Sequence, residues 1–393
     1  MIATTGTSGR GRATILSLAA IAAMGSLAMQ LVVPALPMMA HDFAATPAAV
    51  QKVIGIYLLG LAMGQFIAGP IADRVGRRPI LLSGLALFIS GSIGAAAAPG
   101  LTWLLAARLL QALGGACGIV TARVMVGDLF PPEENAARQA TLMSVVLLSP
   151  AVAPVIGGTL AELAGWRMIF AVLAATGTCV AAFALLRLHE TRRLARQAPP
   201  KLTHAWGELI RIPRFTGHAL AIACGSAGLY SFLASAPFLM AREHGIGPRD
   251  TGLLLLIVAG SSIIGTKFVG RIDRHGRGAM AGAAISAIGA GLMLLFALAG
   301  WRHLAALILP MLFIGFGSGI LGPTGIAQVI ASRPGLEGTA ASLAGATQMT
   351  ASAIASSLIG AAGTLRLGAV VLALSLVALS AATFGRRPVD LAA

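Results

Sequence analysis

The sequence predicts an all-α integral membrane protein with twelve transmembrane helices in two pseudo-symmetric six-helix bundles. Three observations predict this class: 57% of the 393 residues are hydrophobic, only 10% are charged, and long uncharged segments recur along the whole chain. A soluble domain usually carries about 25% charged residues, which cover its water-facing surface. The spans of a membrane β-barrel would show alternating segments of about ten residues, and the sequence has no such pattern.

Each predicted helix is a segment without Asp, Glu, Lys or Arg. About 20 residues cross roughly 30 Å of hydrocarbon. The twelve segments are 13–41, 53–72, 79–107, 109–122, 139–161, 168–186, 215–241, 251–266, 278–301, 303–332, 338–365 and 367–385. Two are short because Arg108 or Lys267 interrupts a longer apolar run. The first segment could be read as a signal peptide, but it is too long for the apolar region of one, so we assign it to helix 1.

The basic residues predict the orientation of the chain. If the N-terminus is cytoplasmic, most of the 28 Lys and Arg residues lie in cytoplasmic loops. This is the positive-inside pattern, and it predicts a multi-pass protein of the cell inner membrane with both termini in the cytoplasm. It also explains the net charge of +15 without a nucleic-acid partner. The three cysteines lie in apolar segments and indicate neither a disulfide framework nor a metal site.

The domain division follows from the longest polar stretch, residues 188–213, which contains the pair Pro199–Pro200. We predict a cytoplasmic linker there, with a short helix near Ala205–Ile210, between an N-terminal bundle (1–187) and a C-terminal bundle (214–393). The pentapeptide DRVGR at 73–77 recurs as DRHGR at 273–277, after the second segment of each half. Parallel repeats with a binding site between them at the bilayer midplane are a transporter architecture.

The loop within "GLAMGQFIAGPIADRVGRRP" (60–79) concentrates charge between two apolar segments. Glycine allows close helix packing, a carboxylate can bond a helix N-terminus, and arginines bind the anionic membrane face. A plain basic loop explains the arginines but not the acid and the glycines. The charged and glycine positions of this loop and of its repeat in the second half are Gly69, Asp73, Arg74, Gly76, Arg77, Arg78, Asp273 and Arg274.

Two further motifs lie inside helices. "RLLQALGGA" (108–116) places Arg108 and Gln111 within helix 4, where a charge either faces a cavity or partner or extends to the outer interface. "SPAVAPVIGG" (149–158) contains Pro150, Pro154, Gly157 and Gly158, which bend helix 5 and allow close packing. The alternative for the second motif is a kinked packing helix without a role in transport.

These motifs resemble the major facilitator superfamily, and within it the twelve-helix drug:proton antiporters of the bicyclomycin and chloramphenicol resistance branch. The resemblance implies the major facilitator fold, a conformational gate formed by the loop positions named above from Gly69 to Arg78 with Asp273 and Arg274, assistance by Arg108 in proton transfer, and export for chains that carry the helix 5 motif. The sequence departs from the branch at Gln30, where an acidic residue is usual, and at Gly127, where Arg is common. Glycines of the motifs are also replaced, at Ala112, Ser149 and Ala153.

Because of Gln30, helix 1 has no carboxylate before Asp42. The proton-coupling candidates are Arg108, Asp128 and Glu162, although both acids could also be helix caps or loop charges. A few polar groups in an apolar pocket suit a drug-sized amphiphile, and an arginine without a facing acid favours neutral or anionic compounds. The predicted substrate cavity contains Gln30, Tyr57, Arg108, Gln111, Tyr230, Phe238 and Gln348.

The predicted function is a secondary active exporter that exchanges small amphiphilic drugs for protons by alternating access. We expect a monomer whose partners are substrate, protons and membrane lipid, with the proton gradient as energy source and no cofactor. An importer or facilitator of a small metabolite remains the alternative, and a non-transporting sensor remains open. A membrane enzyme is disfavoured, because the sequence contains neither Cys-x-x-Cys nor a phosphate-binding loop, and its histidines are scattered.

Overall fold

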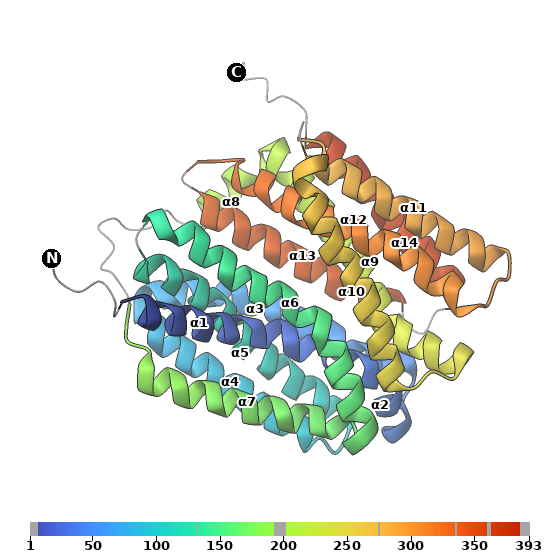
Figure 1. Cartoon of the computed structure of the whole chain (residues 1–393), viewed down its shortest axis with the longest axis horizontal. Coiled ribbons are helices and arrows are strands. Elements are labelled where there is room, and N and C mark those ends of the chain that lie inside the picture. The colour runs from blue at the N-terminus through green and yellow to red at the C-terminus, as the bar shows by residue number, and fades with distance from the viewer. Residues whose placement is uncertain are drawn as a thin grey trace.

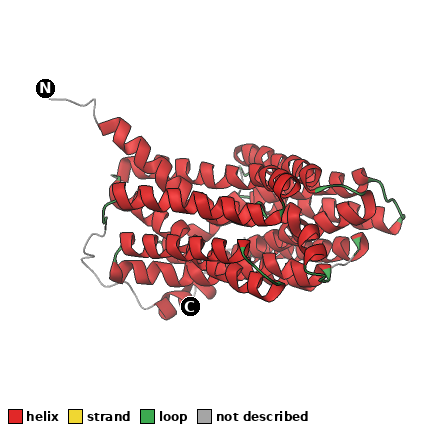
Figure 2. Ribbon diagram, turned by 90° about the horizontal axis from the view of Figure 1, so that it is seen from below, coloured by secondary structure: helices red, strands yellow, loops and turns green. Residues whose placement is uncertain are grey.

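The computed structural model describes residues 7–130, 132–191, 202–273, 276–334, 336–359 and 363–385. Over these residues the secondary structure is helical, with no strand. Figure 1 shows α1 to α7 packed as one group and α9 to α14 as a second group beside it. The long helices run side by side along the molecule (Figure 2). The predicted all-α membrane fold with two helical bundles is confirmed.

The first group begins with a broken helix. Pro34 lies in η1, and Pro37 lies at the start of α2. Proline lacks the backbone N–H that would continue the helix, so the segment predicted as one span is divided. The elements are α1 (Thr7–Gln30), η1 (Val33–Ala35), α2 (Leu36–Asp42), α3 (Pro47–Val75), α4 (Arg77–Ala96), α5 (Leu101–Leu129), α6 (Pro132–Ala164) and α7 (Trp166–Arg187).

The second group is preceded by a short helix in the predicted linker. This helix, α8 (Leu202–Ile210), confirms the one expected near 205–210. Residues 192–201 of the linker lie outside the described residues, and the division at 188–213 stays a prediction. The remaining elements are α9 (Pro213–His244), α10 (Pro248–Ile272), α11 (Gly278–Leu298), α12 (Leu304–Ile330), α13 (Glu337–Ile359) and α14 (Thr364–Phe384).

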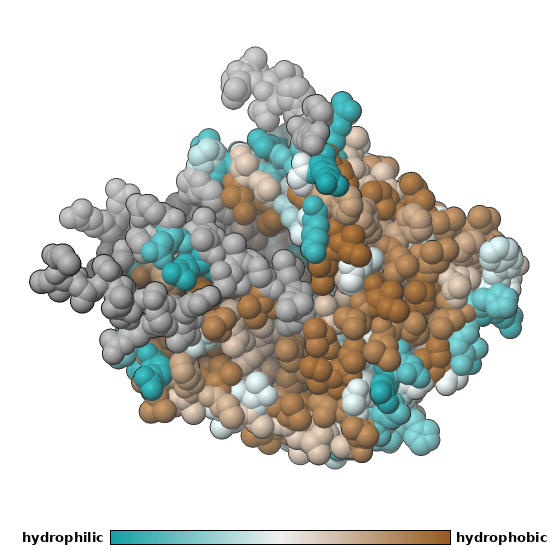
Figure 3. Space-filling view, viewed as in Figure 1, coloured by the Kyte–Doolittle hydropathy of each residue, from teal (hydrophilic) through white to brown (hydrophobic). Residues whose placement is uncertain are grey.

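Ten helical segments of the described chain are long and apolar enough to cross a membrane. The other two of the twelve long helices are α6, with 33 residues, and α13, with 23 residues. Large apolar side chains remain on the outside of the molecule, among them Leu163 (79% exposed) and Leu186 (80% exposed). Figure 3 shows hydrophobic residues over most of the described part of one face. In a membrane this surface contacts lipid, which explains its composition.

The two groups meet mainly along two helix pairs, α6 with α10 and α3 with α13. At the α6–α10 crossing the backbones are so close that a methyl group on Gly252 would overlap the carbonyl of Pro154. In the same region α6 packs on α1, where a methyl on Gly157 would overlap the carbonyl of Leu31. Glycine is needed at both positions because any side chain would separate the helices.

Candidate functional site

A cavity of about 510 Å³ lies between the two helical groups. Its longest wall is one face of α10, since the lining residues on that helix recur at intervals of three and four. They extend from Leu255 to Lys267, a rise of roughly 18 Å along the helix. The opposite walls come from α1, α6, α9 and α12 and include Gln30, Ala151, Pro154, Leu229, Tyr230, Leu233 and Gly315.

The cavity has a closed end and a basic end. Near Leu255 it is closed by the contact of Gly252 with the carbonyl of Pro154. At the other end of the α10 wall lies Lys267, near the last turn of the helix. Among the described lining residues, Lys267 carries the only charge and none is acidic. The cavity is therefore mostly apolar, with a few uncharged polar side chains, and is basic at one end.

Gln30 and Tyr230 are the predicted cavity residues that the structure places in this lining. The Gln30 side chain is 6% exposed, and its Oε1 atom has no hydrogen-bond partner within the described structure. A buried amide oxygen without a donor is costly, because it has lost its hydration without a replacement. Because Gln30 lines the cavity, this buried oxygen is an unsatisfied acceptor within the cavity wall.

Arg108 is fully buried behind the cavity, within the first helical group. Its Nη1 donates to the Gln111 Oε1 at 2.6 Å and to the Ala28 carbonyl at 3.2 Å. The guanidinium carbon lies 3.8 Å from the centroid of the Tyr57 ring, a cation–π distance. Tyr57 in turn donates to the Gly25 carbonyl at 2.8 Å. The side chain is therefore directed inward, and the alternative of extending to the outer interface does not hold here.

Gln111 continues this buried network, because its Nε2 donates to Ser92 Oγ at 2.7 Å. Within the described residues, no carboxylate lies within ion-pair distance of Arg108, and its Nε and Nη2 atoms lack hydrogen-bond partners. The charge is thus balanced by carbonyl and amide dipoles and by aromatic faces. Arg108 and Gln111 therefore form a polar core of this helical group, separate from the lining of the cavity.

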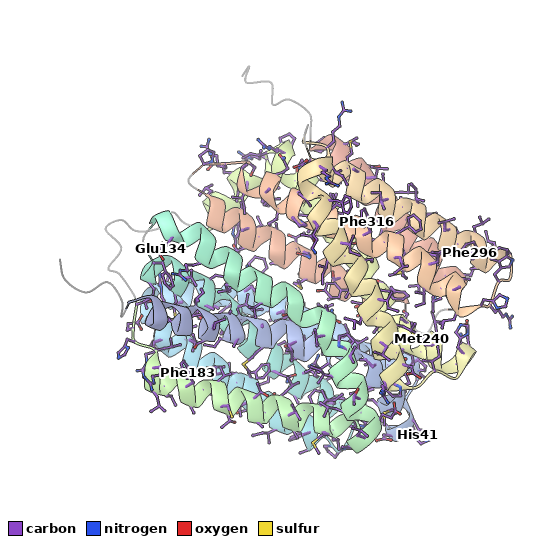
Figure 4. The ribbon with its side chains drawn as sticks, viewed as in Figure 1. His41, Glu134, Phe183, Met240, Phe296 and Phe316 are labelled. Carbon is purple, nitrogen blue, oxygen red and sulfur yellow. The ribbon has the colours of Figure 1, made fainter. Side chains whose placement is uncertain are left out.

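The other two predicted cavity residues lie elsewhere. Phe238 lines a second cavity of about 440 Å³, between α2, α3 and α9 at the end of the molecule where His41 and Met240 are labelled (Figure 4). Gln348 joins α13 to α9, because its Nε2 donates to Ser226 Oγ at 2.7 Å. The sequence predicts both residues in a single pocket because it indicates which helices line the cavity but not which face each helix turns inward.

A residue not predicted from the sequence, Gln51, bonds the two halves beside the second cavity. Its side chain is fully buried, and Nε2 donates to the Ala234 carbonyl at 3.1 Å and to Ser235 Oγ at 3.4 Å. These atoms belong to α3 and α9, in different halves of the chain. Together with the crossing of α6 and α10, this bond holds the halves in contact at this end.

The predicted gate loop lies at the opposite end, where α3 passes into α4. Gly76 joins the two helices with φ +120°, in a region that favours glycine. The carboxylate of Glu190, another residue not predicted, accepts the backbone N–H groups of Arg77 at 2.9 Å and Arg78 at 3.1 Å. These N–H groups have no acceptor within the helix, so Glu190 caps the N-terminus of α4.

Asp128 completes this cluster from α5. Its Oδ2 atom lies 3.3 Å from Arg77 Nε and accepts the Thr191 hydroxyl at 3.2 Å. The first residues after α7 are therefore bonded to both α4 and α5. Of the two acidic coupling candidates, Asp128 is ion-paired, while Glu162 is exposed near the end of α6.

The other residues of the predicted gate lie at several places on α3, after α10 and before α11. Asp273 caps α11, since its Oδ1 accepts the Gly278 N–H at 2.7 Å. Arg74 is exposed, and Gly69 has the Val120 side chain about 4.0 Å from where a Cβ would lie. Arg274 and the side chains of Asp73 and Pro150 lie outside the described residues, so the roles predicted for them stay predictions.

Comparison with known proteins gives relatives over nearly the whole chain. The family model described as Major Facilitator Superfamily matches residues 18–357. Multidrug resistance protein D of Escherichia coli (strain K12) is 30% identical over 88% of this chain and 87% of its own. A chloramphenicol resistance protein of Pseudomonas aeruginosa is 30% identical over 78% of this chain and 73% of its own.

Among solved structures, the fold is similar to a bacterial homolog of the human lysosomal transporter Spinster, in an inward-facing and unoccupied conformation. The TM-score is 0.77, with 16% sequence identity and 97% of both chains covered.

Proposed function

The chain belongs to the Major Facilitator Superfamily, and we propose that it exports small amphiphilic compounds in exchange for protons by alternating access. Its family and its relatives are transporters, so it is a multi-pass membrane transporter rather than an enzyme. Two of the relatives are named for multidrug or chloramphenicol resistance. The observation that carries the proposal is the cavity of about 510 Å³ between the halves, closed at one end by glycine-mediated contact.

Alternating access requires contacts that hold one end shut and can be exchanged for contacts at the other. The crossing of α6 and α10 and the buried bond from Gln51 to Ala234 supply the first set. With both termini in the cytoplasm, as the basic loops predict, the closed end is the outer one. Rocking of one six-helix group against the other would then open that end around the same cavity.

The cavity supports the choice of a drug-sized substrate. Its volume is within the range of about 300–1,000 Å³ that holds small-molecule ligands, and its walls are mostly apolar. None of its described lining residues is acidic, which disfavours lipophilic cations and favours neutral or anionic compounds. The proton would be carried by Asp128, Glu162 or a group coupled to Arg108. The protein would act as a monomer.

Transport in phosphatidylcholine proteoliposomes tests the proposal. Radiolabelled chloramphenicol, an anionic derivative and a lipophilic cation would be followed with an imposed pH gradient, and again after a proton ionophore has dissipated it. We expect gradient-dependent movement of the neutral or anionic compound in exchange for protons. Movement that is indifferent to the pH gradient would refute the exchange, and no movement of any compound above protein-free liposomes would refute drug export.

The alternative with the same fold is import or facilitated diffusion of a small metabolite. The direction of the gradient dependence separates it from export. Cells lacking the protein give a second readout, because loss of an exporter lowers the drug concentration that stops growth, whereas loss of an importer does not.

A further inference from the structure

Lys267 is the one charged residue among the described residues that line the central cavity, and its side chain is exposed. It lies five residues before the end of α10, roughly 7 Å along the helix axis from that end, and it lines the cavity between the halves. A charge at such a depth normally pairs with another charge or faces a water-filled cavity. Within the described structure, no carboxylate lies within ion-pair distance of its ammonium group. The cavity therefore has a positive charge at one end without a partner from its own walls.

The opposite end of the cavity contains an acceptor. Gln30 is the last residue of α1, next to Leu31, whose carbonyl contacts Gly157 of α6. One turn away on α6, Pro154 forms the closed end, so Gln30 lies at that end. Its buried Oε1 atom has no hydrogen-bond partner among the described residues. A ligand with an N–H or O–H donor would satisfy it.

The walls between these two groups are mostly apolar, and Tyr230, Ser262 and Thr266 are their polar members. Along α10 they include Leu255, Val258, Ala259 and Ile263, and from α9 come Leu229 and Leu233. The distance between the ends is set by the α10 face, which rises roughly 18 Å from Leu255 to Lys267. A compound that fits is elongated, with an anion at one end, an apolar body, and a hydrogen-bond donor at the other end.

We propose that the cavity selects anionic amphiphiles, whose carboxylate, sulfonate or phosphate group binds the ammonium group of Lys267. This inference rests on the proposed function and narrows its substrate class. Both a soluble organic anion and an anionic lipid headgroup have this chemistry. The proposal depends on the positive charge of Lys267, so a substitution that removes only this charge tests it.

The test uses equilibrium dialysis of the purified full-length protein with a matched pair of probes. Radiolabelled chloramphenicol is neutral, and its hemisuccinate carries the same ring and amide with one hydroxyl esterified by a succinyl group that ends in a carboxylate. We expect the wild type to bind the hemisuccinate about tenfold more tightly, the factor for one charge-assisted hydrogen bond at a partly exposed site. The preference should disappear in Lys267→Gln and persist in Lys267→Arg.

Arg271→Gln is the matched control. Arg271 is a basic, exposed residue one turn further along α10, but it is not part of the cavity lining. Its removal changes the net charge by the same amount and should leave the tenfold preference intact. Equal binding of the two probes by the wild type, or a preference that survives Lys267→Gln, would overturn the proposal.

Salt dependence gives a second measurement that requires no variant. Binding of the hemisuccinate to the wild type should weaken between 50 mM and 500 mM sodium chloride, because ions screen the lysine, while binding of chloramphenicol should not. Hemisuccinate binding that is indifferent to salt would also contradict the proposal. Selective binding without transport in liposomes would refute the exporter and leave the anion site standing.

Nanodiscs of stated composition distinguish an anionic lipid from a soluble anion as the source of the group that binds Lys267. Hemisuccinate binding would be compared in pure phosphatidylcholine and in phosphatidylcholine with phosphatidylglycerol. If phosphatidylglycerol displaces the hemisuccinate from the wild type, the anion at Lys267 can come from a lipid. If the affinities agree, the site takes soluble anions. In both cases the Lys267→Gln variant should show no difference between the two membranes.

Discussion

Gly157 provides the sharpest prediction about the contact of α6 with the first helix. An added methyl group there would overlap the carbonyl oxygen of Leu31, and the atom it meets is backbone, which cannot rotate away. Overpacking of this kind typically costs about 1–3 kcal/mol of stability. We expect a value near the upper end of this range because the neighbouring atom is backbone. The higher helix propensity of alanine offsets about 1 kcal/mol of this loss of stability. We therefore expect Gly157→Ala to lower the free energy of unfolding by about 2 kcal/mol.

Gly260 is the matched control because it also lies within a long helix, α10, but has no atom within 4 Å of an added Cβ. Gly260→Ala gains the helix propensity without the overlap, so it should stabilise by up to about 1 kcal/mol. The two identical substitutions should thus have opposite signs. A change of 1 kcal/mol corresponds to about 2–4 °C in Tm for a unit of 150–250 residues, the size of one half.

The assay measures thermal unfolding of the detergent-solubilised protein through its own cysteines. Cys224 is buried and Cys117 is half-buried, so a thiol-reactive dye reports their exposure on heating. Cys179 is exposed and would be replaced by alanine in every variant to remove the background signal. We expect a Tm about 4–8 °C below the parent for Gly157→Ala and slightly above it for Gly260→Ala. If the Tm of Gly157→Ala equals or exceeds that of the parent, α6 does not approach the backbone at Leu31 as closely as described.

Three further substitutions test single bonds. Glu190→Ala removes the cap of α4 and should cost about 1–2 kcal/mol, measured as a lower Tm, with Glu190→Gln closer to the parent because its oxygen still accepts. An equal loss in both variants would contradict capping. Gln111→Leu leaves a donor of Arg108 unpaired in a buried site and should cost about 1–3 kcal/mol by the same assay, so an unchanged Tm would refute the network. Gln51→Leu removes the bond to the Ala234 carbonyl, and a cysteine introduced at Ala241 should then react faster with an impermeant thiol reagent. An unchanged rate would show that the bond does not hold that end closed.

The fold was largely predictable because its signals are local. Each crossing helix requires about 20 apolar residues in succession, and charge placement separates them, so hydropathy locates the segments without knowledge of contacts. The break within the first segment was not predicted, although Pro34 and Pro37 could have indicated it through their missing N–H groups. The short helix α8 was predicted from its position in the linker, and the structure confirms it.

The candidate site was less predictable because its bonds join distant residues. Glu190 bonds backbone 113 residues away, and Gln51 bonds backbone 183 residues away. Neither pair leaves a periodic pattern in the sequence. Arg108 and Gln111, in contrast, are three residues apart on one helix, and their proximity follows from helix geometry. The cavity lining depends on the rotation of each helix, which twelve similarly apolar segments do not reveal.

The attachment of Glu190 and Thr191 to the first half limits how the halves can move. Because these residues are bonded to α4 and α5, the chain after α7 is attached to the first half as far as Thr191, and α8 starts at Leu202. Residues 192–201 can span at most roughly 35 Å when fully extended. A displacement of the second half beyond this reach would pull on the first turn of α4 through Glu190. The turn between α3 and α4 would then sense the distance between the halves mechanically.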